Sequence, residues 1–538
     1  MQEWWRGAVL YQIYPRSFAD GNADGIGDLE GVRRHLPYVA GLGVDGIWLS
    51  PFFTSPMKDF GYDVSDYRGV DPCFGTLADF DALLLDAHRL GLKVIIDQVY
   101  SHSSDRHPWF EESRRSRDNA KADWYVWADP RPDGTPPNNW LAVFGGPAWT
   151  WDSRRRQYYF HNFLPEQPDL NLHNQAVQDA VLGEAAFWLD RGVDGFRIDV
   201  ANLYCHDPRL TDNPPKPGPV PDRPYRMQRP LYTRDRPETL AFVARFRTLL
   251  DRYRERMAVA ELASTDDSLA TMIAYTDGPD RYHTAYSFVL MRDGVDAPGI
   301  RRALEAVGRG STKAWPSWAF SNHDVVRAPS RWGAGAGEGD PAPARLLIAL
   351  LCCLRGTIFL YQGEELGLPQ ADVPFEKLQD PEGRAFWPRH PGRDGARTPM
   401  PWQADAPHAG FCPGDVEPWL PVDPRHRPLA VDRQQDDPTS TLAFTRAFLA
   451  WRRGQLPLIR GDIRFLDAAP PVLAFERTLA GRRLLCVFNV GDREVRAALP
   501  VPRPGEPVAP LPAPGAAGCL QEGAVSLPPW AFVFADFA

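Results

Sequence analysis

The chain has 538 residues, of which 43% are hydrophobic and 24% charged, and its formal net charge is −9. This length predicts two to four domains around a large buried core, and the composition excludes a largely disordered chain. The acidic balance argues against a nucleic-acid-binding protein, because that function needs clustered Lys and Arg, and no apolar run is long enough to span a membrane.

The first six residues contain neither the basic nor the apolar part of a secretion signal. The seven cysteines form no Cys-x-x-Cys motif, and their odd number is typical of a reducing compartment rather than of a disulfide framework or a zinc site. We therefore expect a cytoplasmic protein, a monomer or a homodimer, with no membrane or nucleic-acid partner.

Short apolar runs typical of buried strands recur along most of the chain. In order they are Ala8–Tyr14, Gly46–Ser50, Lys93–Val99, Gly195–Val200, Met257–Glu261, Thr284–Phe288, Trp318–Ser321 and Thr357–Tyr361. Helical patterns such as Leu77–Leu90 and Gln175–Asp190 lie between them. Apolar strands that alternate with helices indicate an α/β protein with a parallel sheet, and eight such units favour a closed (β/α)8 TIM barrel over an open sheet.

Longer segments interrupt this alternation and predict the domain organisation. Residues 101–171, rich in Trp, Pro, Asn and Gly, are expected to form a small inserted domain B after the third strand. The Pro-rich His206–Arg236 segment follows the fourth strand, and Gly367–Arg433 follows the eighth.

After a helix at Ser440–Arg453 the sequence changes character, and three runs alternate like antiparallel strands: Val472–Glu476, Arg483–Phe488 and Ala524–Phe534. We predict a barrel from residues 1–100 and 172–455, domain B at 101–171, and a C-terminal β-sandwich at 456–538.

Ionisable residues stand at the predicted carboxyl ends of several strands, and these ends meet at one mouth of a barrel. They include the carboxylates Asp199, Glu261 and Asp324. Two carboxyl groups that flank one bond are the minimum for glycoside hydrolysis. Arg197, two residues before Asp199, would hold that carboxylate charged, whereas the apolar Ala258–Ala260 run would raise the pKa of Glu261. Each acid taken alone also fits a helix cap; their order at barrel spacing favours a catalytic site.

The same residues lie in a series of motifs that resembles the α-amylase family of glycoside hydrolases, on its α-glucosidase and oligo-1,6-glucosidase side. The resemblance covers nearly the whole chain. Its motifs are Phe60-Gly-Tyr-Asp63, Asp97-Gln-Val-Tyr-Ser-His102, Gln167-Pro-Asp-Leu-Asn171, Gly195-Phe-Arg-Ile-Asp199, Glu261, Ser321-Asn-His-Asp324, Tyr361-Gln-Gly-Glu-Glu365 and Arg397-Thr-Pro-Met-Pro-Trp402.

The resemblance implies that Asp199 is the nucleophile, Glu261 the acid/base and Asp324 the residue that stabilises the distorted glucosyl ring. Further implied contacts to the sugar come from His102, Arg197 and His323, from Tyr62 by stacking, and from Asp63 and Arg397, which would clamp the distal hydroxyls. Phe144 and Phe163 either wall this pocket or belong to the core of domain B. Asp63 could instead shape a turn, and Arg397 could form a surface ion pair.

An oxygen-rich loop after the first strand predicts one structural Ca²⁺ or Mg²⁺. Asp20, Asn22, Asp24 and Asp28, with the Ile26 carbonyl, alternate with small residues and could surround a hard cation. The loop is similar to the cation site of the oligo-1,6-glucosidase group; the alternative is a Gly/Asp turn that carries solvated charge.

The function expected from these residues is a retaining exo-α-glucosidase that acts on short maltose- or isomaltose-like α-glucosides and transfers glucose to acceptor alcohols. In relatives, Val at the position of Val200 accompanies α-1,6 bonds, although Val also favours a strand by itself. One alternative is a transglucosylase that rearranges sucrose or trehalose. Another is a non-catalytic barrel used as an interaction module, which the complete set of acids disfavours.

Overall fold

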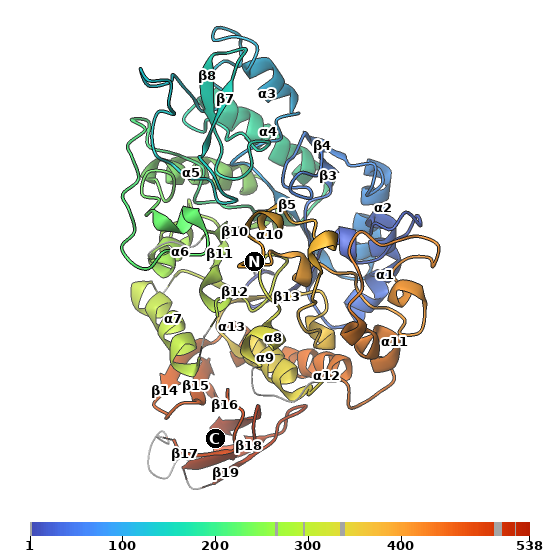
Figure 1. Ribbon diagram of the computed structural model, residues 1–538. Helices are drawn as coiled ribbons and strands as arrows, with labels where there is room; N and C mark the ends of the chain where they lie inside the picture. The colour runs from blue at the N-terminus through green and yellow to red at the C-terminus, as the bar shows by residue number, and fades with distance from the viewer. Residues whose placement is uncertain are drawn as a thin grey trace.

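The computed structural model describes residues 3–263, 267–293, 296–311, 313–333, 339–499, 508–521 and 523–537, and an eight-stranded parallel sheet forms its centre (Figure 1). The strands are β1 (Val9–Ile13), β2 (Gly46–Leu49), β5 (Lys93–Gln98), β9 (Gly195–Ile198), β10 (Met257–Leu262), β11 (Thr284–Ser287), β12 (Ser317–Ala319) and β13 (Thr357–Tyr361). Their order is β11-β10-β9-β5-β2-β1-β13-β12, and a parallel bridge between Ala285 and Pro316 joins the two ends. The predicted (β/α)8 barrel is confirmed.

Side chains along each strand alternate between the barrel interior and the surrounding helices. On β10, Met257 and Val259 pack in an interior cluster with Trp48 and Phe359, whereas Ala258 and Ala260 pack in the outer core. Glu261 continues the interior series of Met257 and Val259, and it therefore points into the barrel at its carboxyl end.

Several of the helices that cover the barrel begin at a residue whose side chain caps the helix. They include α1 (Leu29–Gly41), capped by Asp28, α2 (Leu77–Arg89), capped by Thr76, α4 (Gln175–Arg191), capped by Asn174, and α12 (Thr441–Arg453), capped by Ser440. The others are α5 (Pro237–Leu250), α6 (Ser268–Thr276), α7 (Ala297–Gly310), α8 (Ala328–Trp332), α9 (Ala342–Cys353), α10 (Pro381–Phe386), α11 (Val431–Gln434) and α13 (Leu456–Arg460). Of the described helices, none is long and apolar enough to cross a membrane.

The segment after β5 folds as a small unit at one end of the barrel (Figure 1). It contains α3 (Pro108–Ser113) and a three-stranded antiparallel sheet in the order β6 (Trp127–Ala128), β8 (Gln157–Phe160), β7 (Trp149–Asp152). Trp140, Trp149 and Phe160 form a separate core cluster there. The hairpin of β3 (Phe53–Thr54) and β4 (Asp66–Val70) precedes it in the chain.

The C-terminal region contains two antiparallel sheets. One has the order β14 (Asp462–Leu466), β15 (Val472–Leu479), β16 (Arg482–Asn489), β21 (Phe532–Phe537), β18 (Val508–Leu511), and the other has the order β17 (Val495–Ala498), β20 (Ala524–Leu527), β19 (Cys519–Gln521). A shared apolar cluster joins the sheets. The prediction of one strand over Ala524–Phe534 is wrong: the chain turns at Trp530, where φ is +52°, and β20 and β21 lie in different sheets.

Candidate active site

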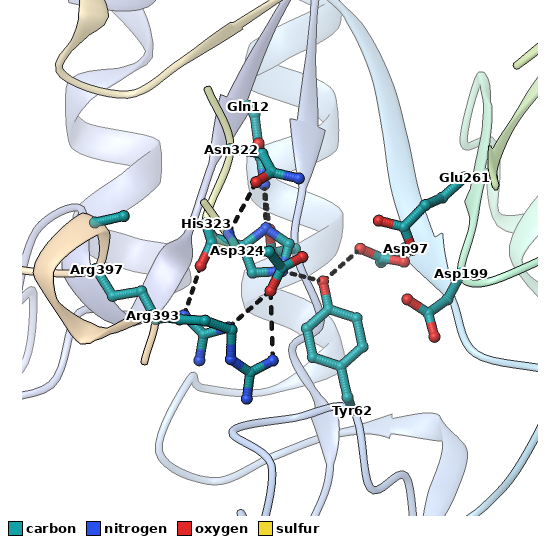
Figure 2. Close-up of polar contacts among 12 residues, drawn as sticks. Gln12, Tyr62, Asp97, Asp199, Glu261, Asn322, His323, Asp324, Arg393 and Arg397 are labelled. Atoms are coloured by element: carbon teal, nitrogen blue, oxygen red, sulfur yellow. Dashed lines mark hydrogen bonds and ion pairs between the residues drawn. The ribbon is translucent and has the colours of Figure 1, made fainter. Parts of the chain in front are cut away.

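Four interior-facing side chains at the carboxyl ends of neighbouring strands form the centre of the site. Asp97 belongs to β5, Arg197 to β9, Glu261 to β10 and Tyr286 to β11, and Asp199 follows β9 directly. All five are buried, with at most 5% of the residue surface exposed. Figure 2 shows Asp97, Asp199 and Glu261 gathered on one side of the Tyr62 ring.

The guanidinium of Arg197 contacts three of these carboxylates. Its Nη1 donates to Asp97 Oδ1 at 2.7 Å and to Asp199 Oδ1 at 2.6 Å, and its Nη2 forms an ion pair with Glu261 Oε2 at 2.7 Å. One positive charge therefore faces three buried acids. Such an arrangement favours retention of a proton among the acids.

Burial dominates the acidity of these groups. It raises the pKa of Glu261 to about 7 against the opposing effect of Arg197, and the charges of Asp199 and Asp324 raise it further. The prediction of a raised pKa for Glu261 is confirmed. Arg197 favours the charged form of Asp199, as expected, but burial outweighs this effect and raises the pKa of Asp199 to about 7.

The backbone after β9 turns sharply at Val200, which has a φ of +35°. A β-branched residue rarely adopts this left-handed conformation. It directs the Val200 N–H at Glu261 Oε2, 3.2 Å away, while the Ala201 N–H donates to the Glu261 carbonyl at 2.9 Å. The turn thus ties the residue after Asp199 to Glu261 and fixes the two acids relative to each other.

Asp324 lies between this group and two arginines (Figure 2). Its Oδ1 is 3.0 Å from Arg397 Nη2 and 3.4 Å from Arg393 Nη1. Burial alone would raise the pKa of Asp324, but His323 and the two arginines outweigh it and hold the pKa well below the usual value. Asp324 is therefore a permanent anion at neutral pH. Arg397 is 1% exposed, which excludes the surface ion pair considered for it.

A hydrogen-bonded chain links Gln12 to Asp97. The Gln12 amide nitrogen lies 2.8 Å from His323 Nδ1, His323 Nε2 lies 2.7 Å from Tyr62 Oη, and Tyr62 O–H donates to Asp97 Oδ2 at 3.1 Å. Burial lowers the pKa of His323 to about 3, so the ring is neutral, with its proton on Nε2 when Gln12 donates to Nδ1. The Tyr62 ring lies 5.4 Å from the His323 ring and parallel to it.

His102, Phe163 and Phe144 form a second wall. His102 Nε2 lies 3.0 Å from the Tyr62 carbonyl oxygen, and the His102 ring lies 5.2 Å from that of Phe163. Phe163 in turn contacts Phe144, whose ring lies 4.9 Å from the Arg393 guanidinium carbon. Phe144 and Phe163 therefore lie beside the arginine network, and neither belongs to the small core cluster around Trp140.

Asp63 is not paired with Arg397 in the described part of the chain. Its carboxylate is fully buried and accepts hydrogen bonds from Ser55 Oγ and from the Lys58 and Asp59 N–H groups. This is the turn-shaping role that was the alternative. The contact of Asp63 with the distal hydroxyls of the sugar stays a prediction, and Asp59, not Asp63, takes part in the arginine network.

Asp59 and Arg393 were not predicted from the sequence. Arg393 Nη2 lies 2.7 Å from Asp59 Oδ1 and 2.7 Å from Asp380 Oδ1, and its Nη1 reaches Asp324. The sequence Arg393-Asp-Gly-Ala-Arg397 could have indicated this role of Arg393. It places one arginine at each end of a short 3-10 turn, Asp394–Ala396.

The predicted cation loop is compact and closes on its own backbone. Asp20 accepts from the Asn22, Ala23 and Gly25 N–H groups, and both oxygens of Asp28 accept backbone N–H groups. Within the described ranges, no three His, Cys, Asp or Glu side chains converge to hold a metal ion. The hard oxygen donors suit Ca²⁺ or Mg²⁺, since a carboxylate oxygen that accepts one hydrogen bond keeps a lone pair for a cation.

A closed parallel barrel with acids at its carboxyl rim is the architecture of a barrel enzyme. Residues 12–461 match the family model described as "Alpha amylase, catalytic domain". The chain belongs to the α-amylase family, and it is a glycoside hydrolase.

Similar proteins align with this chain over most or all of its length. It is 51% identical to a probable α-glucosidase of Rhizobium meliloti (strain 1021), with 100% of this chain and 98% of that protein aligned. It is 37% identical to an oligo-1,6-glucosidase of Heyndrickxia coagulans over 92% of this chain and 93% of the relative. The crystal structure of the α-glucosyl transfer enzyme XgtA matches with a TM-score of 0.96 and 53% identity over 100% of both chains.

Proposed function

We propose that the protein is a retaining, exo-acting α-glucosidase that releases glucose from the non-reducing end of short maltose- or isomaltose-like α-glucosides. The observation that carries the proposal is the pair of carboxylates, Asp199 and Glu261, on one buried guanidinium, with the anionic Asp324 nearby. Retention requires two carboxyl groups on one sugar, one as nucleophile and one as acid.

In the first step, Asp199 attacks the anomeric carbon and forms a covalent glucosyl ester. The bond to the leaving oxygen breaks with its electron pair, and the proton of Glu261 passes to that oxygen. In the second step, Glu261 takes a proton from water, the water oxygen bonds to the anomeric carbon, and Asp199 leaves. The raised pKa of Glu261 suits a group that gives up a proton and then regains it.

A cluster of charged side chains on one side of the site supports exo action. Asp59, Arg393, Arg397 and Phe144 pack together beside Asp324. We place the distal hydroxyls of the terminal glucose against this group, because its guanidinium groups offer donors and its carboxylates offer acceptors. A glucose whose distal hydroxyls are bound in this way is the non-reducing end of its chain.

Transfer of glucose to an acceptor alcohol is a second activity that we propose for the same intermediate. The similarity to the α-glucosyl transfer enzyme XgtA supports it. An alcohol that replaces water in the second step gives a new glucoside. Rearrangement of sucrose or trehalose is the special case in which the released sugar itself is the acceptor.

We propose that the loop after β1 binds one Ca²⁺ or Mg²⁺. Its ligands would be Asp20, Asn22, Asp24, the Ile26 carbonyl and Asp28. Burial, with a smaller effect from the charge of Asp20, raises the pKa of Asp28, although Asp28 accepts backbone hydrogen bonds that oppose the shift. A bound cation would neutralise part of the acidic charge of the loop and stabilise it, with no part in the reaction.

The decisive experiment is incubation with maltose, kojibiose, nigerose, isomaltose and sucrose, followed by NMR of the first glucose released. The proposal requires α-glucose before mutarotation. Release of β-glucose would contradict the double-displacement mechanism, and a new disaccharide from sucrose without net glucose would favour the rearranging transglucosylase.

A further inference from the structure

The hydroxyl of Tyr286 lies between Arg197 and Glu261 inside the barrel. It is 3.2 Å from Arg197 Nε and 3.2 Å from Glu261 Oε1, and Tyr286 is 2% exposed. The ring is fixed among Trp48 and Phe359, with centroid distances of 6.3 Å and 6.0 Å.

The direction of these hydrogen bonds follows from the donor inventory. Arg197 Nε is only a donor, so the Tyr286 oxygen accepts there, and its single proton is left for Glu261 Oε1. Burial keeps the pKa of Tyr286 well above its usual value, and the negative charge of Glu261 adds to the shift, so the proton stays in place.

We propose that Tyr286 is a positioning residue that orients the Glu261 carboxyl group and stabilises its ionised form. The inference rests on the proposed acid/base role of Glu261. Tyr286 holds Oε1, while the Val200 N–H holds Oε2, so the carboxyl group is fixed from two elements, β11 and the turn after β9. A tyrosine that donates to the carboxylate offsets part of the rise in pKa that burial causes.

Other charges act on Glu261 and remain when Tyr286 is changed. Arg197 on β9 faces it at 2.7 Å. The carboxylates of Asp97, Asp199 and Asp324 act on it from β5, from the turn after β9 and from the segment after β12. The test must therefore separate the loss of one hydroxyl from a change in this charge set.

Tyr286→Phe removes the hydroxyl and keeps the ring. Because the lost hydrogen bond favoured the carboxylate, the pKa of Glu261 rises, and the alkaline limb of kcat/KM moves to higher pH by about 0.5 to 1 unit. The acidic limb, which we assign to Asp199, should move less, because the Tyr286 hydroxyl donates to Glu261 and affects Asp199 only through the shared charges. Hydrolysis of 4-nitrophenyl α-glucoside, whose leaving group needs no proton, should slow less than hydrolysis of maltose.

Tyr282→Phe is the matched control, because Tyr282 is equally buried but lies before β11, at the opposite end of that strand. Its pH profile should coincide with that of the parent. Replacing Tyr286 with 3,5-difluorotyrosine strengthens the donor and should move the alkaline limb to lower pH, which tests the inference even if the Phe variant folds poorly.

Coincident alkaline limbs for the parent and both Tyr286 variants would overturn the inference. The Glu261→Gln variant, measured alongside on maltose, shows whether such a result contradicts only the role of Tyr286 or also the acid/base role of Glu261. If Glu261→Gln keeps parental turnover, the acid/base assignment is itself wrong.

Discussion

At the scale of single residues, Arg197 determines how the acids share charge. Its one cation contacts Asp97, Asp199 and Glu261, and burial raises the pKa of all three carboxyls. Removal of any one acid therefore changes the protonation of the other two. The effects of single substitutions at these acids on activity should therefore not be additive.

Asp199→Asn removes the proposed nucleophile with almost no change in shape. We expect kcat/KM on 4-nitrophenyl α-glucoside to fall by at least ~10³-fold, because an amide cannot form the glucosyl ester. Asp81 lies on α2 and forms an ion pair with Arg191 at the end of α4; Asp81→Asn is the control and should retain parental activity. A purified Asp199→Asn protein with near-parental turnover would contradict the assignment.

Asp59 and Asp63 offer a second comparison. Asp59→Asn should lower kcat/KM by about 10²-fold, because Arg393 loses a buried partner and shifts beside Asp324. Asp63→Asn breaks hydrogen bonds within its loop and should cost about 1–3 kcal/mol of stability, with a smaller effect on kcat/KM. Steady-state kinetics and thermal unfolding of both variants decide between these roles, and the reverse pattern would indicate Asp63 as the substrate contact.

The sequence alone located Asp199, Glu261 and Asp324 because strand ends of a parallel barrel converge. It could not distinguish Asp59 from Asp63. The two lie four residues apart in one loop, and the left-handed backbone at Phe60 (φ +48°) and Gly61 (φ +106°) decides which carboxylate turns toward Arg393. Loop conformation of this kind leaves no periodic pattern in a sequence.

At the scale of elements, the loop of Asp20–Asp28 combines a proposed cation site with the cap of α1. Chelation of divalent cations should lower the midpoint of thermal unfolding, and added Ca²⁺ or Mg²⁺ should restore it. Asp24→Ala should abolish this response. Asp28→Ala should in addition cost about 1 kcal/mol without any cation, because Asp28 caps α1 by accepting from the Gly31 N–H. A midpoint that chelation leaves unchanged would show that the loop is a turn with solvated charge.

Barrel strands were predictable because burial on both faces makes each a continuous apolar run. The short strands of the C-terminal sheets could not be predicted in this way. β17, β18 and β19 have three or four residues each, and most of these are exposed or half-buried. The break within Ala524–Phe534 depends on the turn at Trp530, which follows Pro528 and Pro529.

At the scale of the whole molecule, Arg477 of β15 joins the C-terminal sheets to the barrel layer. Its guanidinium is fully buried and donates to the carbonyls of Cys353, at the end of α9, and of Gly461 and Asp462. Few other donors could replace it there, because a guanidinium presents five N–H groups in one plane.

Arg477→Ala would leave these carbonyls unpaired, so we expect a loss of about 3 kcal/mol in stability and faster proteolysis near residue 461. Differential scanning calorimetry and limited trypsin digestion measure both effects. Arg482→Ala, which removes an exposed ion pair with Asp536 on the same sheet, should cost at most about 1 kcal/mol. Equal melting of the two variants would show that Arg477 does not hold the regions together.

The pairing of β11 with the segment at β12 closes the barrel, and few backbone contacts form it. In the described residues one backbone bridge, Ala285 to Pro316, connects the ends of the eight-stranded sheet, and a proline has no N–H to add to it. Side-chain hydrogen bonds of Thr284 Oγ1 with the Trp315 carbonyl and with Ser317 Oγ add to this connection. A closed barrel has no edge strand with which a neighbouring chain could pair, whereas an opened barrel exposes two edge strands. If this pairing opens during heating or folding, the same polypeptide acquires a surface on which copies can add to one another and aggregate.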